Sequence, residues 1–378
     1  MADLSRTTIL QQRGMVVVKV GTNVLADASG LLDQHRITSL AGQIVRVQQQ
    51  GWRVVLVSSG AIGAGIGKLK LRKRPTDLPH LQACAAIGQT ALMQLYQTAL
   101  APHGVQAAQI LLTAGDFESR SRYLNMRNTI RTLFEYGCLP IINENDTVSV
   151  AEIKFSDNDH LAALVANLMQ APLLVLLTNV AGLYASDPNT NPNAELVPTV
   201  PLIDRSISEM AGNTQSKLGT GGMRSKLKAA RIATASGSAV IMADGSRDAV
   251  LDGIFAGETV GTLFLPHCDA VTAKKRWLGF TVRPKGIAIV DDGAKRAIAE
   301  LGKSLLPVGV KNISGEFGKG DLISICDTTG SEIARGLCNF SAIEAQAIIG
   351  KKAEQIAELL GKVPYDELIH RDNMVLME

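Results

Sequence analysis

The sequence has no apolar run that approaches the roughly 20 residues needed to span a bilayer. Its opening residues, MADLSRTTIL, lack the apolar stretch of a secretory signal. Only five cysteines occur among 378 residues, and no two of them form a C-x-x-C pair. This usage argues against a disulfide framework, a zinc site or a redox motif. We therefore expect a cytoplasmic protein with reduced thiols and no membrane partner.

An excess of charge of one sign is also missing. The chain carries 38 Lys and Arg against 35 Asp and Glu, a net charge of +3. No strong field of the whole molecule therefore attracts nucleic acid or an anionic membrane. Hydrophobic residues make up 46% of the chain and charged residues 19%, which is typical of a folded globular protein. The length indicates two or three domains, at about 100 to 200 residues per domain.

The common nucleotide-binding motifs are absent as well. Each Gly-Lys pair, such as Gly67-Lys68 or Gly318-Lys319, lacks the glycine five positions earlier that a P-loop requires. The glycines between Gly60 and Gly67 miss the G-x-G-x-x-G spacing of dinucleotide-binding folds. A P-loop kinase and a dehydrogenase are both disfavoured.

From residue 15 to about 265, short apolar runs alternate with stretches of helical period. This alternation is typical of βα units that build a mainly parallel sheet covered by helices, an α/β sandwich. The predicted strands are 15–20, 53–57, 109–112, 139–142, 173–177 and 239–242. The predicted helices are 34–50, 81–100, 120–136, 160–169 and 223–236, the last ended by Gly237.

The pattern changes after Leu265, where a polar link over 266–276 contains proline. Short β-like runs separated by glycine then predict a small barrel or sandwich, with strands at 286–290, 308–310, 321–325 and 333–337. We expect one domain over 1–265 and a second over 276–362.

Polar clusters follow the predicted strands of the first domain. In open α/β sheets, ligands bind at the carboxyl ends of the strands, so these clusters are expected to meet in one crevice. Each has a structural alternative: a solvent-facing lysine, a helix cap or a turn. The clusters are 19–23, 57–61, 143–146, 156–159 and 178–184. The glycines that follow the second cluster, up to Gly67, predict a glycine-rich turn.

A further cluster, over 218–226, is the most informative. Three glycines in four positions, Gly219, Gly221 and Gly222, precede a predicted helix, and Lys226 follows on its first turn. Glycines before a helix let backbone N–H groups converge on an anion, and the helix dipole and lysine add positive charge. This pattern predicts a phosphate site.

Taken in order, these segments resemble the amino-acid kinase family. The resemblance rests on VVVKVGTNVL, VSSGAIGAG, INENDTV, FSDNDHLAA, LTNVAGLYASDPNTNP and GTGGMRSKLKAA. It extends over nearly the whole chain, because SLLPVGVKNISGEFGKGD and HRDNMV are similar to a PUA domain appended to some members. The resemblance implies a three-layer α/β sandwich around a mainly parallel sheet, followed by a small β-barrel-like PUA domain.

The resemblance also implies an activity. Members most similar to this chain transfer the γ-phosphoryl group of ATP to the side-chain carboxylate of L-glutamate, giving glutamyl 5-phosphate on the route to proline. A carboxylate is ionised and nucleophilic near pH 7, so no general base is required. The co-substrate is ATP, with Mg²⁺ carried by its phosphates rather than by a protein cage.

Position by position, the resemblance implies three sets of site residues. The catalytic set is Lys19, Lys226 and Asp159, with Asp159 orienting both lysines. Ser59, Asp146 and Asn158 match the glutamate-binding positions. The ATP-binding set is Lys19, Gly21, Thr178, Asn179, Thr220, Gly221, Gly222, Met223, Arg224, Ser225 and Lys226. Asn179 departs from the Asp often found there.

Several partners and alternatives complete these expectations. The resemblance implies proline as a feedback inhibitor acting near a lid over 61–80, a homo-oligomer, and glutamate-5-semialdehyde dehydrogenase as a pathway partner. RNA is an open question, because residues 276–378 carry 13 Lys and Arg against 14 Asp and Glu, without the basic face that phosphate contacts need. The alternatives are a kinase of the same fold acting on acetylglutamate, aspartate, carbamate or uridylate, and an RNA-binding protein.

Overall fold

The computed structural model describes residues 4–27, 30–149, 158–188, 190, 191, 193–210, 222–267, 283–351, 355, 356, 359 and 367–377. Two compact units divide the chain, Met1–Ala270 and Val271–Glu378. Most of the link predicted at 266–276 lies outside the described residues.

The first unit is built on a mixed sheet that is mostly parallel. Its strands are β1 (Met15–Val20), β2 (Arg53–Ser58), β3 (Ala107–Leu112), β4 (Leu139–Glu144), β5 (Leu173–Thr178), β6 (Thr199–Val200), β7 (Ala239–Asp244) and β8 (Thr262–Phe264), in the spatial order β3-β4-β2-β1-β5-β7-β8-β6. All neighbours are parallel except β7 and β8, which are antiparallel. The predicted parallel sheet is confirmed.

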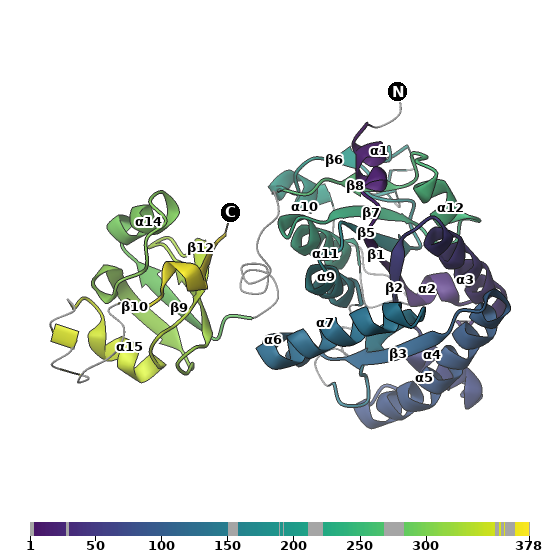
Figure 1. Cartoon of the computed structure of the whole chain (residues 1–378), viewed down its shortest axis with the longest axis horizontal. Helices are drawn as coiled ribbons and strands as arrows, with labels where there is room; N and C mark the ends of the chain where they lie inside the picture. The colour runs from purple at the N-terminus through teal and green to yellow at the C-terminus, as the bar shows by residue number, and fades with distance from the viewer. Residues whose placement is uncertain are drawn as a thin grey trace. The chain divides into compact units, whose positions relative to one another are not determined.

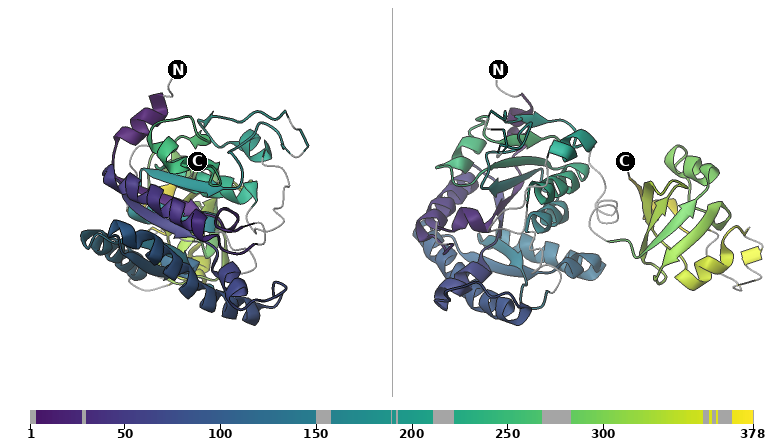
Figure 2. Two further views of the ribbon diagram at one scale, coloured as in Figure 1. Left: turned by 90° about the vertical axis from the view of Figure 1, so that its right-hand side faces the viewer. Right: turned by 180° about the vertical axis from the view of Figure 1, so that it is seen from behind.

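Helices cover both faces of this sheet (Figures 1 and 2). They are α1 (Leu4–Gln11), α2 (Thr22–Leu25), α3 (Gln34–Gln49), α4 (Ala61–Lys68), α5 (Leu78–Leu100), η1 (Ala101–His103), α6 (Ala114–Glu118), α7 (Arg120–Glu135), α9 (Asn158–Met169), α10 (Arg205–Met210), α11 (Met223–Ala235) and α12 (Val250–Phe255). The five helices predicted from periodicity are present, with ends shifted by up to three residues. The predicted three-layer sandwich is therefore confirmed.

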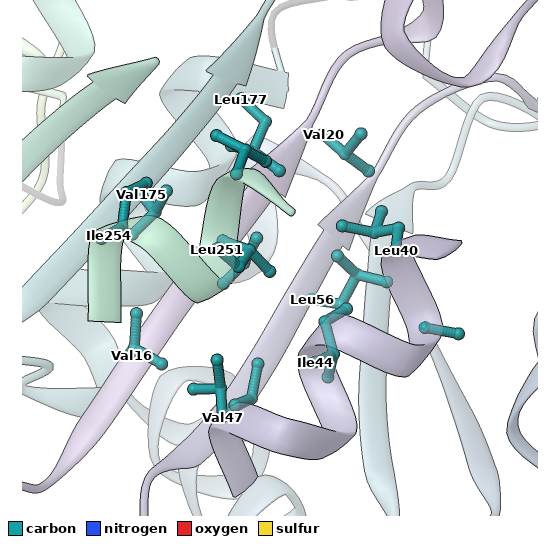
Figure 3. Close-up of a cluster of buried hydrophobic side chains, with 14 of the residues drawn as sticks. Val16, Val20, Leu40, Ile44, Val47, Leu56, Val175, Leu177, Leu251 and Ile254 are labelled. Atoms are coloured by element: carbon teal, nitrogen blue, oxygen red, sulfur yellow. The ribbon is translucent and has the colours of Figure 1, made fainter. Parts of the chain in front are cut away.

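Alternating side chains of the central strands build the core on one face of the sheet. Val16, Val18 and Val20 of β1 pack in one cluster with apolar residues of α3, α5 and α12. Figure 3 shows Val16 and Val20 in this cluster with labelled residues of α3 and α12. Successive side chains of a strand point to opposite faces, so Lys19 lies on the other face, toward α9. The alternation along β1 thus buries its valines and directs its single lysine elsewhere.

The segment from Ala61 to Lys68 is a helix, which corrects the prediction of a glycine-rich turn there. Its glycines let α4 approach α5 to backbone contact. A Cβ atom added at Gly65 would lie 1.8 Å from the carbonyl oxygen of Cys84, and one added at Gly88 would lie 1.8 Å from that of Ala61. Because α4 begins directly after the Ser59-Gly60 turn, this contact fixes the position of that turn.

The second unit contains a five-stranded sheet with flanking helices. Its strands are β9 (Gly286–Val290), β10 (Val310–Gly315), β11 (Leu322–Cys326), β12 (Glu332–Leu337) and β13 (Met374–Leu376), in the order β10-β9-β11-β12-β13. Its helices are α14 (Asp292–Ala299), η3 (Pro307–Gly309), α15 (Ala342–Ile348) and η4 (Arg371–Asn373). The small β-rich unit is confirmed, whereas its helices were not predicted.

The bounds predicted for the strand at 308–310 are wrong. Residues Pro307–Gly309 form a short 3₁₀ turn, and the strand begins at Val310. Pro307 has a fixed φ and no N–H group to offer a neighbouring strand, which favours the turn. In the part of the chain that the structure describes, no helix has both the length and the hydropathy to cross a bilayer.

The contact between α4 and α5 gives a first prediction. Gly88→Ala should lower the free energy of unfolding by roughly 1 to 3 kcal/mol or more, because the added methyl group has to displace backbone rather than a flexible side chain. Urea denaturation of the full chain measures this change.

Gly42→Ala is the matched control, since Gly42 also lies within a long helix, α3. A Cβ atom there would meet only the end of the Arg46 side chain, at 3.5 Å. Alanine should stabilise that helix by up to about 1 kcal/mol. Equal effects of the two substitutions would contradict the proposed backbone contact.

Candidate active site

A crevice opens at the carboxyl ends of the central parallel strands. Residues from the ends of β1, β2, β4 and β5 line it, together with the beginnings of α2, α4 and α9 and the first turn of α11. Nine of the predicted site residues meet there: Lys19, Gly21, Ser59, Asp146, Asn158, Asp159, Thr178, Asn179 and Lys226. The sheet order explains this, because β1 lies between β2 and β5 and brings their ends together.

The carboxylate of Asp159 lies between two buried lysines. Lys19 Nζ is 2.5 Å from Asp159 Oδ1, and Lys226 Nζ is 2.9 Å from Asp159 Oδ2. All three residues are buried: Lys19 is 6% exposed, Lys226 is 8% exposed and Asp159 is 2% exposed. Each carboxylate oxygen of Asp159 therefore pairs with one ammonium group, and the three side chains together carry a net charge of about +1.

The pKa of the Asp159 carboxyl reflects this pairing. Burial by itself would raise that pKa, but the charges and hydrogen bonds of Lys19 and Lys226 outweigh burial and lower it from 3.8 to about 2. Asp159 is therefore ionised throughout the physiological range. It holds two cations side by side on one wall of the crevice, where an anion can join them.

Amide and hydroxyl groups form a second part of the site. Asn158 Nδ2 donates to Ser59 Oγ at 2.7 Å and to Asn143 Oδ1 at 3.1 Å. Asn158 begins α9 and Ser59 follows β2, so the bond links two elements that are distant in sequence. Asp146, which is 8% exposed, lines the crevice just after β4.

The turn at Gly60 has a conformation that favours glycine. Its φ of +109° is in the left-handed region, and the residue forms the N-cap of α4. Ala61, Ile62 and Gly63 follow and line the crevice. The N-terminal turn of α4 thus brings backbone N–H groups to the site, which favours an anionic ligand.

Comparisons with known proteins agree with this geometry. The amino acid kinase family matches residues 14–244, and the PUA domain matches residues 286–360. The chain belongs to the amino acid kinase family. It is a kinase, and its second unit is a PUA domain.

Two similar relatives are both named glutamate 5-kinase. The relative from Trichlorobacter lovleyi is 47% identical over 372 residues, which cover 98% of this chain and 99% of the relative. The relative from Methylococcus capsulatus is 48% identical over 361 residues, which cover 96% of each chain.

The predicted nucleotide residues of this kinase do not all line the crevice. Thr178 is buried at the end of β5, and its hydroxyl donates to Asn179 Oδ1 at 3.3 Å, while Asn179 itself is exposed. Gly222, Met223, Arg224 and Ser225 begin α11 but do not line the crevice. Thr220 and Gly221 lie outside the described residues.

Two polar residues near the site, Arg74 and Gln89, were outside the predicted polar clusters. Asn143 belongs to the cluster predicted at 143–146, although no role was assigned to it. Arg74 and Asn143 line the crevice. Gln89 Oε1 accepts a hydrogen bond from Asn143 Nδ2 at 2.8 Å. Gln89 lies on the buried, otherwise mostly apolar face of α5. A polar residue among the apolar positions of a helix could have identified it from the sequence. Arg74 follows α4 in a polar loop with several other cations, so its sequence context gave no reason to select it.

Asp159→Asn should lower the free energy of unfolding at neutral pH by about 3 to 5 kcal/mol, because two buried ammonium groups lose their counter-charge. Since the folded-state pKa of Asp159 lies below the unfolded value of 3.8, its stabilisation is complete above about pH 5. That stabilisation is lost as pH falls toward about 2. The difference between the two proteins should therefore shrink over this acidic range in urea unfolding.

Asp252→Asn is the control for this measurement. Asp252 pairs with Arg46 at 2.7 Å, but both side chains are partly exposed, so the loss should be about 1 kcal/mol or less. A loss of the same size for Asp159→Asn would contradict the proposed role of its buried charge.

Proposed function

We propose that the chain is a glutamate 5-kinase, which transfers the γ-phosphoryl group of ATP to the side-chain carboxylate of L-glutamate. The product, L-glutamyl 5-phosphate, is the first intermediate of proline biosynthesis. The observation that carries the proposal is the buried group of Lys19, Asp159 and Lys226 in a crevice that also contains Asp146. The names of the two relatives support the choice of glutamate among possible acceptors.

The chemistry suits a site without a general base. An oxygen of the glutamate side-chain carboxylate attacks the γ-phosphorus, the bond from that phosphorus to the β,γ-bridging oxygen breaks, and ADP leaves with the electron pair. The acceptor is already an anion, so no proton has to be removed. The main obstacle is repulsion between two anions, and the two lysine ammonium groups reduce it.

Each lysine has a distinct place in this scheme. Lys19 comes from β1 and Lys226 from α11, so they approach Asp159 from different elements. We assign both to phosphoryl oxygens of the transition state and Asp159 to their orientation. Asp159 acts on the reaction through the lysines, because each of its oxygens already contacts one of them.

The nucleotide is assigned to the part of the crevice near β5 and α11. Gly21, Thr178 and Asn179 border this part, and Gly222 is the N-cap of α11, which carries Lys226. Backbone N–H groups of glycine turns suit phosphate oxygens. Mg²⁺ prefers phosphate and water oxygens and enters with ATP, since both oxygens of Asp159 already contact the lysines.

The amino-acid end of glutamate is assigned to Ser59, Asp146 and Asn158. The carboxylate of Asp146 pairs with the α-ammonium group. Arg74 is assigned to the α-carboxylate, because it lines the crevice and no described residue forms an ion pair or a hydrogen bond with it. An acidic and a basic side chain then match the two charges on the α-carbon of the substrate.

The remaining parts of the proposal concern the whole enzyme. Residues 1–265 would contain the complete catalytic domain, and 276–362 the PUA domain, with a regulatory or structural role. We further propose a cytoplasmic homo-oligomer inhibited by proline, with glutamate-5-semialdehyde dehydrogenase as its partner in the pathway. Proline has the α-carboxylate and a secondary ammonium group, so it fits the same end of the crevice as glutamate.

The function is tested by ADP formation with a panel of acceptors: glutamate, acetylglutamate, aspartate, carbamate and uridylate. Glutamate should give the highest kcat/KM, and proline should raise the apparent KM for glutamate. ADP formation that does not depend on glutamate would refute the proposed function.

Lys226→Met should lower kcat by roughly 100- to 1,000-fold, or about 3 to 4 kcal/mol of transition-state stabilisation. The methionine keeps much of the side-chain volume but removes the charge that meets the transferring phosphoryl group. The KM for glutamate should change far less, because Asp146 and Asn158 hold the other end of the substrate. Steady-state kinetics separates the two parameters.

Lys228→Met is the matched control, because Lys228 lies two residues further along α11 and is exposed. It should leave kcat unchanged. A folded Lys226→Met variant with wild-type kcat would exclude the role assigned to Lys226.

Asp146→Asn should have the opposite kinetic signature. Loss of a charge-assisted hydrogen bond to the α-ammonium group should raise the KM for glutamate by roughly 10- to 100-fold, with a smaller effect on kcat. Inhibition by proline should weaken in parallel if the two molecules share this contact. An unchanged KM for glutamate would exclude Asp146 from amino-acid binding.

A further inference from the structure

Three amide side chains form a continuous hydrogen-bonded chain from α5 to the crevice. Asn143 Nδ2 donates to Gln89 Oε1 at 2.8 Å, and Asn158 Nδ2 donates to Asn143 Oδ1 at 3.1 Å. All three side chains are buried, with 8%, 2% and 7% exposure for Gln89, Asn143 and Asn158. Asn143 and Asn158 line the crevice, whereas Gln89 does not.

The direction of this chain is fixed by the backbone of β4. The N–H group of Glu144 donates to Asn143 Oδ1 at 2.8 Å, and a backbone N–H cannot act as an acceptor. Asn143 Oδ1 must therefore face this N–H, and Asn143 Nδ2 must face Gln89. A reversed Asn158 amide would bring its oxygen against Asn143 Oδ1, with two acceptors in contact.

This direction leaves one acceptor of Asn158 available. Asn158 Oδ1 is buried, and no described residue donates to it. An unpaired buried acceptor costs about 1 to 3 kcal/mol, so a ligand donor that reaches it recovers a favourable interaction. The donor expected there is the α-ammonium group already assigned to nearby Asp146 and Asn158.

Gln89 itself is poorly explained as a contribution to stability. Its Nε2 atom is buried and has no hydrogen-bond partner among the described residues. An apolar side chain on this face of α5 would avoid that cost. What Gln89 supplies is the acceptor Oε1, which satisfies Asn143 Nδ2 and reinforces the orientation that the Glu144 N–H group sets for the Asn143 amide.

We propose that Gln89 is a positioning residue for amino-acid recognition. It acts through Asn143 to hold the Asn158 amide with its oxygen available to the α-ammonium group of the acceptor. This inference rests on the proposed function, since it concerns the same amino-acid site. It adds a residue outside the crevice that, together with the Glu144 N–H group, holds the Asn143 amide in the orientation on which Asn158 depends.

The test is Gln89→Met in the full chain, because methionine keeps the length of the side chain and removes the strong acceptor. The KM for glutamate should rise about 10-fold, which corresponds to about 1.4 kcal/mol. The KM for ATP and the kcat at saturating substrates should change less than about 2-fold. Gln94→Met, at an exposed position of the same helix, should change none of these values.

A double-mutant cycle distinguishes positioning from a general structural effect. On an Asn143→Ala background, Gln89→Met should raise the KM for glutamate by less than about 2-fold, because the residue through which Gln89 acts is already gone. Gln89→Glu keeps an acceptor oxygen and should restore a KM close to that of the wild type. If Gln89→Met does not fold, Gln89→Asn replaces it, since its shorter side chain withdraws the acceptor.

Three results would overturn the inference: an unchanged KM for glutamate, an equal rise in the KM for ATP, or independent effects of Gln89→Met and Asn143→Ala. Failure of the proposed function is distinguishable, because it appears in the wild-type enzyme as a lack of glutamate-dependent ADP formation. In that case the double-mutant cycle is repeated with whichever of the tested acceptors the wild-type enzyme phosphorylates.

Discussion

The site depends on one buried ionic interaction, the carboxylate of Asp159 between Lys19 and Lys226. Removing an ion from water costs several kcal/mol, so neither lysine would be stable at its buried position without this counter-charge. The arrangement also has a functional result. Two cations and one anion leave a positive charge in the crevice, and this charge is already oriented before an anionic ligand arrives.

The architecture of the sheet makes this interaction possible. Strand β1 occupies a central position, with β2 on one side and β5 on the other. Its carboxyl end places Lys19 near the first turn of α9, where Asp159 lies, and α11 packs beside α9 and contributes Lys226. The apolar side chains of β1 meanwhile pack into the core on the opposite face. Core and site are therefore built from alternate residues of the same strand.

A second constraint is the backbone contact between α4 and α5. Gly65 and Gly88 allow the two helices to approach more closely than any residue with a Cβ atom would permit. This contact holds the Ser59-Gly60 turn on one side of the crevice and places Gln89, the neighbour of Gly88, within reach of Asn143. A packing requirement and the orientation of polar groups thus depend on the same part of α5.

The sequence by itself determined the class of fold, the six longer strands of the sheet and the polar clusters expected at the edge of that sheet. These features are local: each depends on the period of apolar residues or on a short motif such as the residues around Lys19 or before Lys226. Contacts between distant segments were decided by the tertiary structure. The helix at Ala61–Lys68 is an example, because its glycines resemble a turn until α5 is packed against them. Gln89 and Arg74 are others, since the order of strands and the path of the loop bring them to the site. A sequence specifies which residues repeat along one element, whereas only the packing of elements specifies which side chains share a charge or a hydrogen bond.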